Sequence, residues 1–248
     1  MQNHNAAEPP NLPRSAMVLA AGLGKRMQPI TLTRPKPLVE VNGKTLLDYG
    51  LDALERADVE TIVVNVHYLA DQIENHVAAR CGDSARISDE RANLLDSGGG
   101  IKHALDKLPG DSFYLLNADS FWIEGARPNL LRMADIWDPE KMDFLLLLAS
   151  MKSAVGFNTK GDFNMDSDGL LERRRENEVA PFAYAGAAII NRSVFDGAPD
   201  GAFSINMLFD QALEKGRLFG LRLEGLWLHV GTPEAILEAE EAITSSAA

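Results

Sequence analysis

Apolar and polar residues follow two kinds of pattern along the first 150 residues. Some segments are short and continuously apolar, as buried strands are, and others repeat apolar residues every three or four positions, as one face of a helix does. We expect strands near 16–21, 61–66, 85–88, 112–118 and 143–149, and helices near 45–57, 69–80, 100–108 and 130–136. This order is typical of βαβ units. Residues 15–150 are therefore predicted to form a doubly wound α/β unit whose mostly parallel sheet is covered on both faces.

The pattern changes after Ser150. We expect two short strands around an Asp-Gly turn within 161–175, a buried strand at 182–190 and a helix at 204–216. Two strands that pair with each other should follow at 218–225 and 226–230, and a last helix at 232–243. Thr232 is predicted to be the N-cap of that last helix, with Pro233 at its first position. Since no linker separates the halves, we predict one domain over 1–248, in which residues 151–248 extend the sheet and form a lid over its edge.

Composition narrows the class of protein. With 46% hydrophobic and 24% charged residues, the 248-residue chain can build one full core, and its net charge of −12 argues against broad binding to nucleic acid or anionic membrane. Its single cysteine, Cys81, favours a reducing compartment. The start, Met1 to Ser15, lacks a signal-peptide pattern, and no apolar run approaches the ~18 residues of a membrane span. We therefore expect a soluble cytoplasmic protein with a frayed N-terminus.

A group of cations between Lys25 and Lys36 is a local exception to the acidic composition. It follows Gly22 and Gly24, which are predicted to lie at the carboxyl end of the first strand, where open α/β sheets bind ligands. Glycines there allow backbone N–H groups to approach phosphate oxygens, although two glycines are also common in an ordinary turn. The dinucleotide pattern GxGxxG is excluded because Met27 occupies its third glycine position, and the Walker pattern does not fit either.

The side chains of this segment suit a triphosphate. Arg26 offers a planar fork of donors and Lys36 a compact positive charge. Pro35 and Pro37 restrict the backbone on both sides of Lys36, so its ammonium group is held by a stiff segment.

Several segments together resemble the sugar-1-phosphate nucleotidylyltransferases, also called NDP-sugar pyrophosphorylases. The resemblance runs from about Ser15 to Ile243 and implies a Rossmann-like nucleotidyltransferase fold with a C-terminal sugar-binding half at 151–248. The pairing of the glycine motif with the downstream "PKPL" is far more specific than either alone. The matching segments are "LAAGLGKRM", "RPKPLVEVNGKTLLDY", "LLDSGGGI", "NADS" and "WLHVGTPEAI".

The resemblance assigns roles to residues of the first half. Arg26 and Lys36 match the arginine and lysine that bind the reacting phosphates. Ser97 to Gly100 match a segment whose small residues let the base lie flat against the backbone, and the alternative for them is a simple strand-to-helix turn. The nucleotide-binding set implied in this way is Leu19, Ala20, Ala21, Gly22, Gly24, Ser97, Gly98 and Gly99.

Two residues occupy the positions of the family's metal ligands. Asp119 follows an apolar strand and matches the metal aspartate, although an aspartate there can also cap a turn. His229 departs from the family pattern, which has an aspartate in the corresponding segment. Imidazole is a poor ligand for Mg²⁺, so the alternatives are Mg²⁺ held without it, a softer ion such as Mn²⁺, a contact between His229 and phosphate, or a purely structural histidine.

The sugar side departs from the family as well. Many relatives hold the sugar phosphate with the lysine of a Glu-Lys-Pro segment, whereas the comparable region here carries Arg173, Arg174 and Arg175. We take Arg174 as the candidate, with its two neighbours as alternatives, although a basic triplet is often a solvated strand end. Gly186 is the second candidate contact on the sugar side.

The implied reaction is transfer of NMP from a nucleoside triphosphate to a sugar 1-phosphate, with release of pyrophosphate. A phosphate monoester dianion is already a nucleophile, so no general base is required. Within the family, the segments are most similar to the N-acetylmuramate-1-phosphate uridylyltransferases, which implies UTP, N-acetylmuramic acid 1-phosphate and a salvage reaction. The alternatives are guanylyl transfer to mannose 1-phosphate, cytidylyl transfer to choline phosphate, and a non-catalytic module that binds nucleotide sugars. The oligomeric state is left open.

Overall fold

The computed structural model describes residues 12–246, and the predicted frayed start lies mostly outside them. Within these residues the chain builds a nine-stranded sheet with the order β10-β9-β11-β6-β1-β4-β5, and β8 and β12 extend it from β11. Its strands are β1 (Ser15–Leu19), β4 (Thr61–Val66), β5 (Ala85–Asp89), β6 (Ser112–Asn117), β8 (Phe144–Ser150), β9 (Phe163–Met165), β10 (Leu171–Arg173), β11 (Phe182–Asn191) and β12 (Leu218–Arg222). The strands expected in the first half are therefore confirmed.

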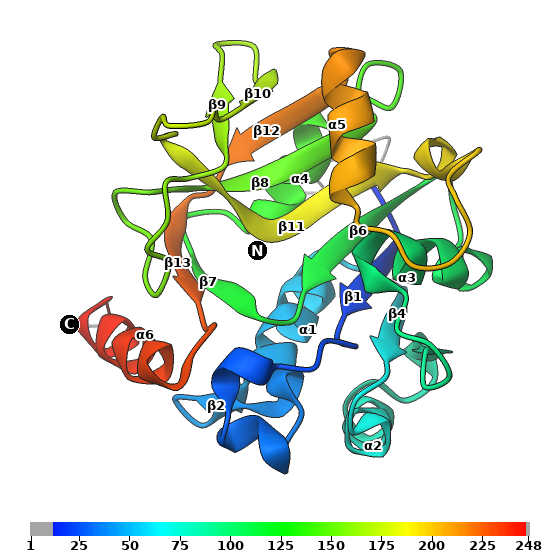
Figure 1. Cartoon of the computed structure of the whole chain (residues 1–248), viewed down its shortest axis with the longest axis vertical. Coiled ribbons are helices and arrows are strands. Elements are labelled where there is room, and N and C mark those ends of the chain that lie inside the picture. The colour runs from blue at the N-terminus through cyan, green and yellow to red at the C-terminus, as the bar shows by residue number, and fades with distance from the viewer. Residues whose placement is uncertain (1–11, 247–248) are drawn as a thin grey trace, which may run out of the picture.

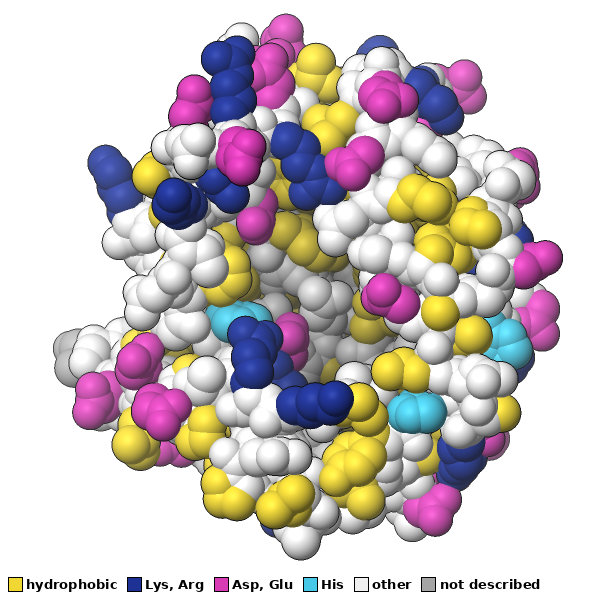
Figure 2. Space-filling model, viewed as in Figure 1, with side chains coloured by type: hydrophobic (Ala, Val, Ile, Leu, Met, Phe, Trp, Pro, Cys, Tyr) yellow, Lys and Arg dark blue, Asp and Glu magenta, His cyan; other side chains and the backbone are white. Residues whose placement is uncertain are grey.

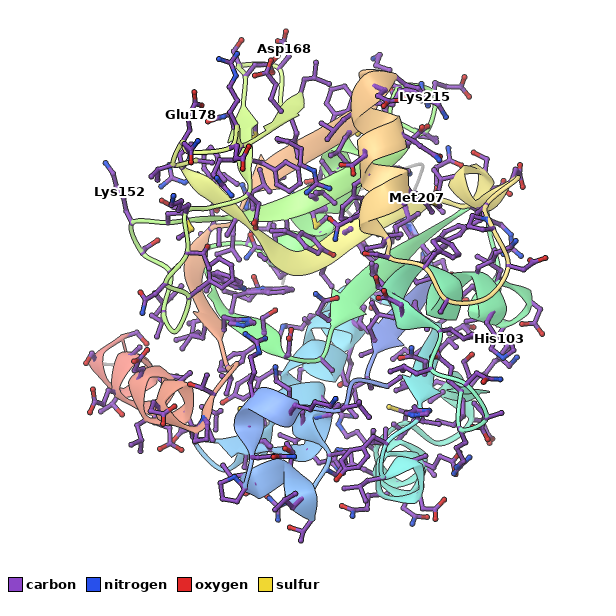
Figure 3. The ribbon with its side chains drawn as sticks, in the orientation of Figure 1. His103, Lys152, Asp168, Glu178, Met207 and Lys215 are labelled. Atoms are coloured by element: carbon purple, nitrogen blue, oxygen red, sulfur yellow. The ribbon has the colours of Figure 1, made fainter. Side chains whose placement is uncertain are left out.

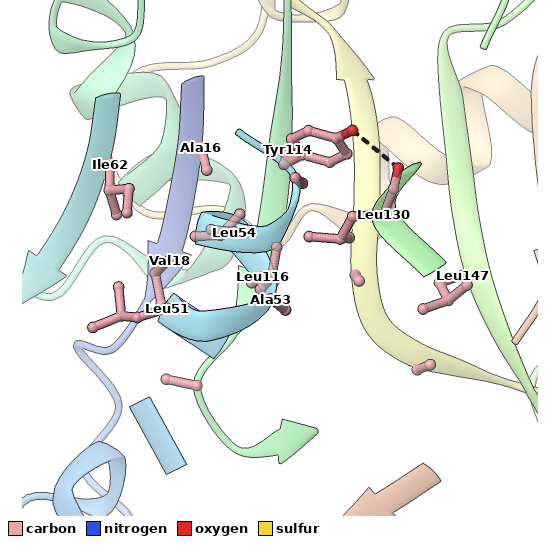
Figure 4. Packing of buried hydrophobic residues seen from close by; sticks show 14 of the residues in the cluster. Ala16, Val18, Leu51, Ala53, Leu54, Ile62, Tyr114, Leu116, Leu130 and Leu147 are labelled. Carbon is pink, nitrogen blue, oxygen red and sulfur yellow. Dashed lines mark hydrogen bonds between the residues drawn. The ribbon is translucent and has the colours of Figure 1, made fainter. Parts of the chain in front are cut away.

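Helices cover both faces of the sheet (Figure 1). The period of two along each strand decides the faces: Ala16 and Val18 pack with α1, α2 and α4, whereas Met17 between them packs with α3 and α5. Figure 4 shows Leu51 and Leu54 of α1 close to β1 in the first of these layers. The helices are α1 (Leu46–Arg56), α2 (Ala70–Cys81), α3 (Asp96–Ala104), α4 (Asn129–Ile136), α5 (Asn206–Glu214) and α6 (Pro233–Ser246).

Strand direction differs between the two halves of the sheet. β6, β1, β4 and β5 are parallel, as predicted, whereas β11 runs antiparallel between β6 and β8. The pairing of β11 with β8 shifts register between Tyr184 and Ala188. β11 bends strongly in Figure 1, as strands do at bulges, which often lie next to functional sites.

The predicted pairing of the runs at 218–225 and 226–230 is wrong. β12 pairs in parallel with β8, whereas β13 (Gly225–His229) leaves the large sheet and pairs with β7 (Ser120–Glu124). Gly225, the first residue of β13, has a φ of 107°, and a side chain on it would collide with the Ile123 carbonyl oxygen. Apolar alternation identifies strands but not their partners, and β7 itself was not predicted.

The predicted start of the third helix at Gly100 is also wrong, because α3 begins at Asp96. Glycine disfavours helices by itself, but here a tertiary contact stabilises the first turn. The N–H groups of Gly98 and Gly99 both donate to the Phe203 carbonyl, at 2.9 and 3.1 Å. The last predicted helix is confirmed as α6, and Thr232 Oγ1 accepts a hydrogen bond from Ala235 N.

Two smaller features complete the fold. β2 (Glu40–Val41) and β3 (Lys44–Thr45) form a short antiparallel pair. The 3₁₀ turns are Lys25–Met27, Ile30–Leu32, Lys36–Leu38, Gly82–Ser84, Leu105–Lys107 and Arg192–Phe195. Across residues 12–246, no helix combines the length and the apolar character needed to cross a membrane.

Candidate active site

Two adjoining cavities lie at the carboxyl ends of the parallel strands, where a ligand site was predicted. Their volumes are about 440 and 260 Å³, and Gly22, Lys36 and Asp119 line both. Figure 2 shows a hollow in the centre of this face with Lys and Arg side chains along part of its rim. The larger cavity is also lined by Leu19, Ala20, Ala21, Pro37, Asn65, Glu90, Leu94, Asp96, Ser97, Asn117 and Ala118, and the smaller one by Gly24, Lys25, Arg26, Met27 and Gly231.

Gly22 and Gly24, in the loop after β1, are glycines for two different physical reasons. Gly24 has a φ of 60°, and a side chain on it would approach Thr31 and Lys36 to 3.0 and 3.1 Å. Gly22 has ordinary backbone angles, and a side chain there would meet nothing within 4 Å among the described residues. The space beside Gly22 is the cleft itself, so this glycine leaves room for a ligand close to the backbone.

Lys36 and Asp119 form an ion pair at the junction of the two cavities. The Nζ–Oδ2 distance is 3.1 Å, and the side chains are only 12% and 32% exposed. Burial acts to raise the pKa of the Asp119 carboxyl group, but the charge of Lys36, with contributions from His229 and Arg26, holds it below the ordinary value. Asp119 is therefore a carboxylate at neutral pH. Lys36 begins a 3₁₀ turn that follows Pro35 and contains Pro37. This position agrees with the stiff segment expected around Lys36.

His229 is the last residue of β13 and pairs with Ser120 of β7. Since Asp119 directly precedes Ser120 in the sequence, His229 lies close to Asp119. The Phe157 ring meets its imidazole edge to face, with the centroids 5.2 Å apart. Burial lowers the pKa of His229; Asp119 opposes this effect, and Lys36 and Arg26 add to it. The imidazole is therefore neutral at pH 7 and keeps a free lone pair on one nitrogen.

Arg26 and His229 both lie close to Gly231, which lines the smaller cavity. A side chain built on Gly231 would lie 2.9 Å from His229 Nε2 and 3.7 Å from Arg26 Nη1. Gly231 thus lacks a side chain where the His229 imidazole packs against its backbone. Arg26 is exposed and lines the smaller cavity, whereas His229 is not among the residues that line either cavity.

The glycines of the "SGGG" segment pack mainly against protein. A side chain on Gly98 would collide with the Phe203 ring at 2.3 Å, and one on Gly99 with the Gly201 carbonyl oxygen at 2.1 Å. Of the predicted base-binding residues in this segment, Ser97 lines the larger cavity. The close approach of residues 201–203 explains Gly98 and Gly99, and their contact with a base stays a prediction.

Arg173 is the last residue of β10, and Arg174 and Arg175 lie in the loop that follows it. The Arg174 guanidinium donates to the carbonyl oxygens of Gly161, Arg175 and Glu178, so it fastens this loop, and Arg173 pairs with Asp210. Figure 3 shows Glu178 at the outer edge of the second half. A contact between Arg174 and the sugar phosphate stays a prediction that this geometry does not favour.

Gly186 lies in the bulge of β11 with a φ of 83°. A side chain on it would meet Ser120 Oγ at 2.5 Å and Asn117 Cβ at 3.2 Å. Asn117 lines the larger cavity but Gly186 itself does not, so a contact between Gly186 and the sugar stays a prediction.

Asn65, Glu90 and Asn117 are among the cleft residues that were missed from the sequence. Asn65 and Asn117 lie near the carboxyl ends of β4 and β6, and Glu90 follows β5 directly. The rule that singled out Asp119, a polar residue at the carboxyl end of a buried strand, would have found all three.

The arrangement as a whole suits a bound polyanion rather than acid–base or nucleophilic catalysis. Arg26, Lys36 and open backbone positions at Gly22 face one volume, and a single carboxylate lies among them. Such a set can position phosphates and neutralise their charge.

Comparison with known proteins agrees with this reading. Residues 15–246 match the family described as Nucleotidyl transferase. The chain is 49% identical over 232 residues to the N-acetylmuramate alpha-1-phosphate uridylyltransferase of Caulobacter vibrioides, a match that covers 92% of this chain and 96% of that protein. It is 28% identical over 239 residues to a mannose-1-phosphate guanyltransferase of Neurospora crassa, covering 90% of this chain and 62% of that protein.

The fold is shared with solved structures at lower identity. The inositol-1-phosphate CTP transferase from T. maritima superimposes with a TM-score of 0.73 at 18% identity, covering 93% of this chain and 97% of that one. The predicted nucleotidyltransferase fold is thereby confirmed. Since the family match extends from β1 to the end of α6, and a relative at 49% identity spans nearly the same length, the chain belongs to the nucleotidyl transferase family.

Proposed function

We propose that this enzyme transfers UMP from UTP to N-acetylmuramic acid 1-phosphate. The observation that carries the reaction type is the Lys36–Asp119 pair at the junction of two cavities, next to the open backbone at Gly22. A nonbonding oxygen of the sugar phosphate attacks the α-phosphorus of UTP. The bond from that phosphorus to the bridging oxygen breaks, and pyrophosphate leaves with the electron pair. No proton has to move.

Different residues of the cleft neutralise the phosphate charge and contact the second substrate in this proposal. The Lys36 ammonium and the Arg26 guanidinium neutralise charge on the phosphates as it shifts towards the leaving pyrophosphate. Asn117, which lines the larger cavity, and Gly186 are proposed to face the second substrate. A non-catalytic binding module is not favoured, because Arg26, Lys36 and Asp119 are all present at the cleft.

Mg²⁺ is the proposed cofactor, with Mn²⁺ as the alternative. Asp119 fits it, because its carboxylate stays ionised and lies where the phosphates would meet. Within residues 12–246, no three His, Cys, Asp or Glu side chains gather into a complete metal site. The remaining ligands would be phosphate oxygens and water, which is the usual coordination of magnesium, and the ion would supply charge neutralisation.

The substrates are proposed from similarity. The relative at 49% identity bears the name of an N-acetylmuramate alpha-1-phosphate uridylyltransferase, whereas the mannose-1-phosphate guanyltransferase is only 28% identical. Guanylyl transfer to mannose 1-phosphate is therefore the second candidate. We further propose that the reaction takes place in the cytoplasm, as a salvage step that yields UDP-N-acetylmuramate.

The test is a matrix of UTP, GTP, CTP and dTTP against several sugar 1-phosphates, with pyrophosphate release as the readout. We expect the highest kcat/KM for UTP with N-acetylmuramic acid 1-phosphate. Choline phosphate with CTP serves as the non-sugar control. Product formation from GTP and mannose 1-phosphate alone would overturn the substrate proposal and leave the reaction type intact.

Substitution of His229 by aspartate separates two roles for this residue. If His229 binds the metal, a carboxylate should lower the Mg²⁺ concentration needed for activity and reduce any preference for Mn²⁺, because a hard cation favours oxygen ligands. If it contacts phosphate, the carboxylate should raise KM for both substrates and leave the metal preference unchanged. Activation curves with Mg²⁺ and Mn²⁺ distinguish these results. Unchanged curves and unchanged KM values would leave only a structural role, through the Phe157 contact.

A further inference from the structure

Two buried polar side chains, Asn65 and Glu90, lie in the wall of the larger cavity and have no part in the reaction described above. They are 3% and 2% exposed. Within residues 12–246, the hydrogen-bond partners of the Glu90 carboxyl group are an amide side chain and a backbone N–H, and none is a cation. Burying a carboxyl group costs free energy unless its oxygens accept hydrogen bonds. The presence of this buried pair beside the cavity therefore requires an explanation.

The pair forms an unbroken chain of hydrogen bonds across the cavity wall. Asn65 Oδ1 accepts from Ala20 N at 2.7 Å, and Asn65 Nδ2 donates to Glu90 Oε1 at 2.7 Å. Glu90 Oε2 then accepts from Leu95 N at 3.0 Å. Only one orientation of the Asn65 amide makes both of its bonds, because Ala20 offers a donor and the Glu90 oxygen an acceptor.

The two ends of this chain lie on different walls of the cleft. Ala20 is the first residue after β1 and opens the glycine loop, which is proposed to hold the triphosphate. Leu95 precedes α3 and lies between Leu94 and Asp96, which line the larger cavity. The pair therefore connects the glycine loop to the turn at the start of α3.

The third glycine of the "SGGG" segment is explained by the same pair. A side chain on Gly100 would lie 2.6 Å from Glu90 Oε1 and 3.0 Å from Asn65 Nδ2. Gly100 thus makes room for the pair, whereas Gly98 and Gly99 make room for residues 201–203. Helix α3 is held against the glycine loop through these two polar side chains.

We propose that Asn65 and Glu90 are positioning residues for the nucleotide, which hold the phosphate loop and the base-side turn at the separation that a nucleoside triphosphate spans. This inference rests on the proposed function. A ligand that touches both walls depends on their separation, and small misplacements cost much of the binding and rate. A ligand that touches one wall alone does not depend on it.

The pair offers a reciprocal exchange as a test. Asn65→Asp alone places two carboxyl groups together in a buried site, and Glu90→Gln alone leaves one oxygen for two N–H donors. In the double variant, the new carboxylate at position 65 accepts from Ala20 N and from the new amide at position 90, whose oxygen accepts from Leu95 N. The double variant keeps the number of heavy atoms, the net charge and every hydrogen bond.

Binding would be measured by calorimetry in the presence of Mg²⁺ and without sugar phosphate, well below the melting temperature of each variant. We expect each single substitution to raise the Kd for UTP about 10-fold or more, while the Kd for inorganic tripolyphosphate changes less than about 3-fold. The KM for the sugar 1-phosphate should also stay within about 3-fold of the wild-type value. The double variant should recover most of the UTP affinity.

Three results would overturn the inference: single variants that bind UTP like the wild type, equal weakening for UTP and tripolyphosphate, or a double variant that regains its melting temperature without its UTP affinity. If Asn65→Asp does not fold, Glu90→Gln and the double variant decide the question by the same measurements. Failure of wild-type protein to bind UTP would count against the proposed substrate alone, and the comparison would then use the nucleotide that the wild type does bind.

Discussion

Replacing Lys36 by methionine should lower turnover by about 10²–10³-fold in a protein that remains folded, the usual cost of losing one such charge contact. Methionine keeps the apolar stem of this largely buried side chain and removes only the ammonium group, which lies 3.1 Å from Asp119 Oδ2. The loss should therefore reside in kcat rather than in the melting temperature. Steady-state rates and thermal unfolding of the same preparation check this expectation.

A second lysine provides the matched control. Lys141 pairs with Asp138 at 2.9 Å on the surface, so Lys141→Met also breaks a lysine–aspartate pair but leaves the cleft intact. Its rate should equal that of the wild type, since exposed pairs contribute little. An unchanged rate in Lys36→Met with normal melting would remove Lys36 from the proposed mechanism.

Asp119→Asn should abolish the dependence of activity on a divalent metal and reduce turnover by at least about 10²-fold, because it removes the charged ligand at the junction of the two cavities. The amide is close in shape to the carboxylate but carries no charge for Mg²⁺ or for Lys36. The check is a titration of activity with Mg²⁺ and with Mn²⁺, together with binding of Mn²⁺ followed by its electron paramagnetic resonance signal.

Asp106→Asn is the control for this substitution, since Asp106 pairs with Lys107 on the surface, away from the cavities. It should leave the metal titration unchanged. If EDTA has no effect on the wild-type rate, the metal proposal fails, whatever Asp119→Asn shows. A loss of turnover without any change in Mn²⁺ binding would instead assign Asp119 to holding Lys36.

Much of the candidate site could be predicted because its signals are local. Gly24 adopts a left-handed backbone angle that glycine accepts at least cost, and Lys36 is held between two prolines, so the residues around them indicate their conformation. Asp119 stands at the end of a strand whose apolar run is visible in the sequence. The identities of UTP and the sugar were inferred from resemblance, since no local pattern encodes a base.

Other parts of the site could not be predicted, because they depend on contacts between distant segments. The Arg174 guanidinium can donate to the carbonyl oxygens of Gly161 and Glu178 only once these residues are folded around it. The bonds from Asn65 to Ala20 and Glu90 join the ends of three strands. Neither set of hydrogen bonds corresponds to a periodic pattern of residues in the sequence.

By itself, the sequence determined most of the helices and strands, β7 and the first turn of α3 excepted, because backbone preference and apolar period act within a few residues. It also indicated the phosphate-binding chemistry that we propose for Gly22 to Lys36. Only the tertiary structure decided that β12 pairs with β8 while β13 pairs with β7. It also decided that Gly98, Gly99 and Gly100 lack side chains because other protein atoms pack closely against them. Those outcomes depend on which surfaces meet after the chain collapses, and that is settled by packing between residues far apart in the sequence.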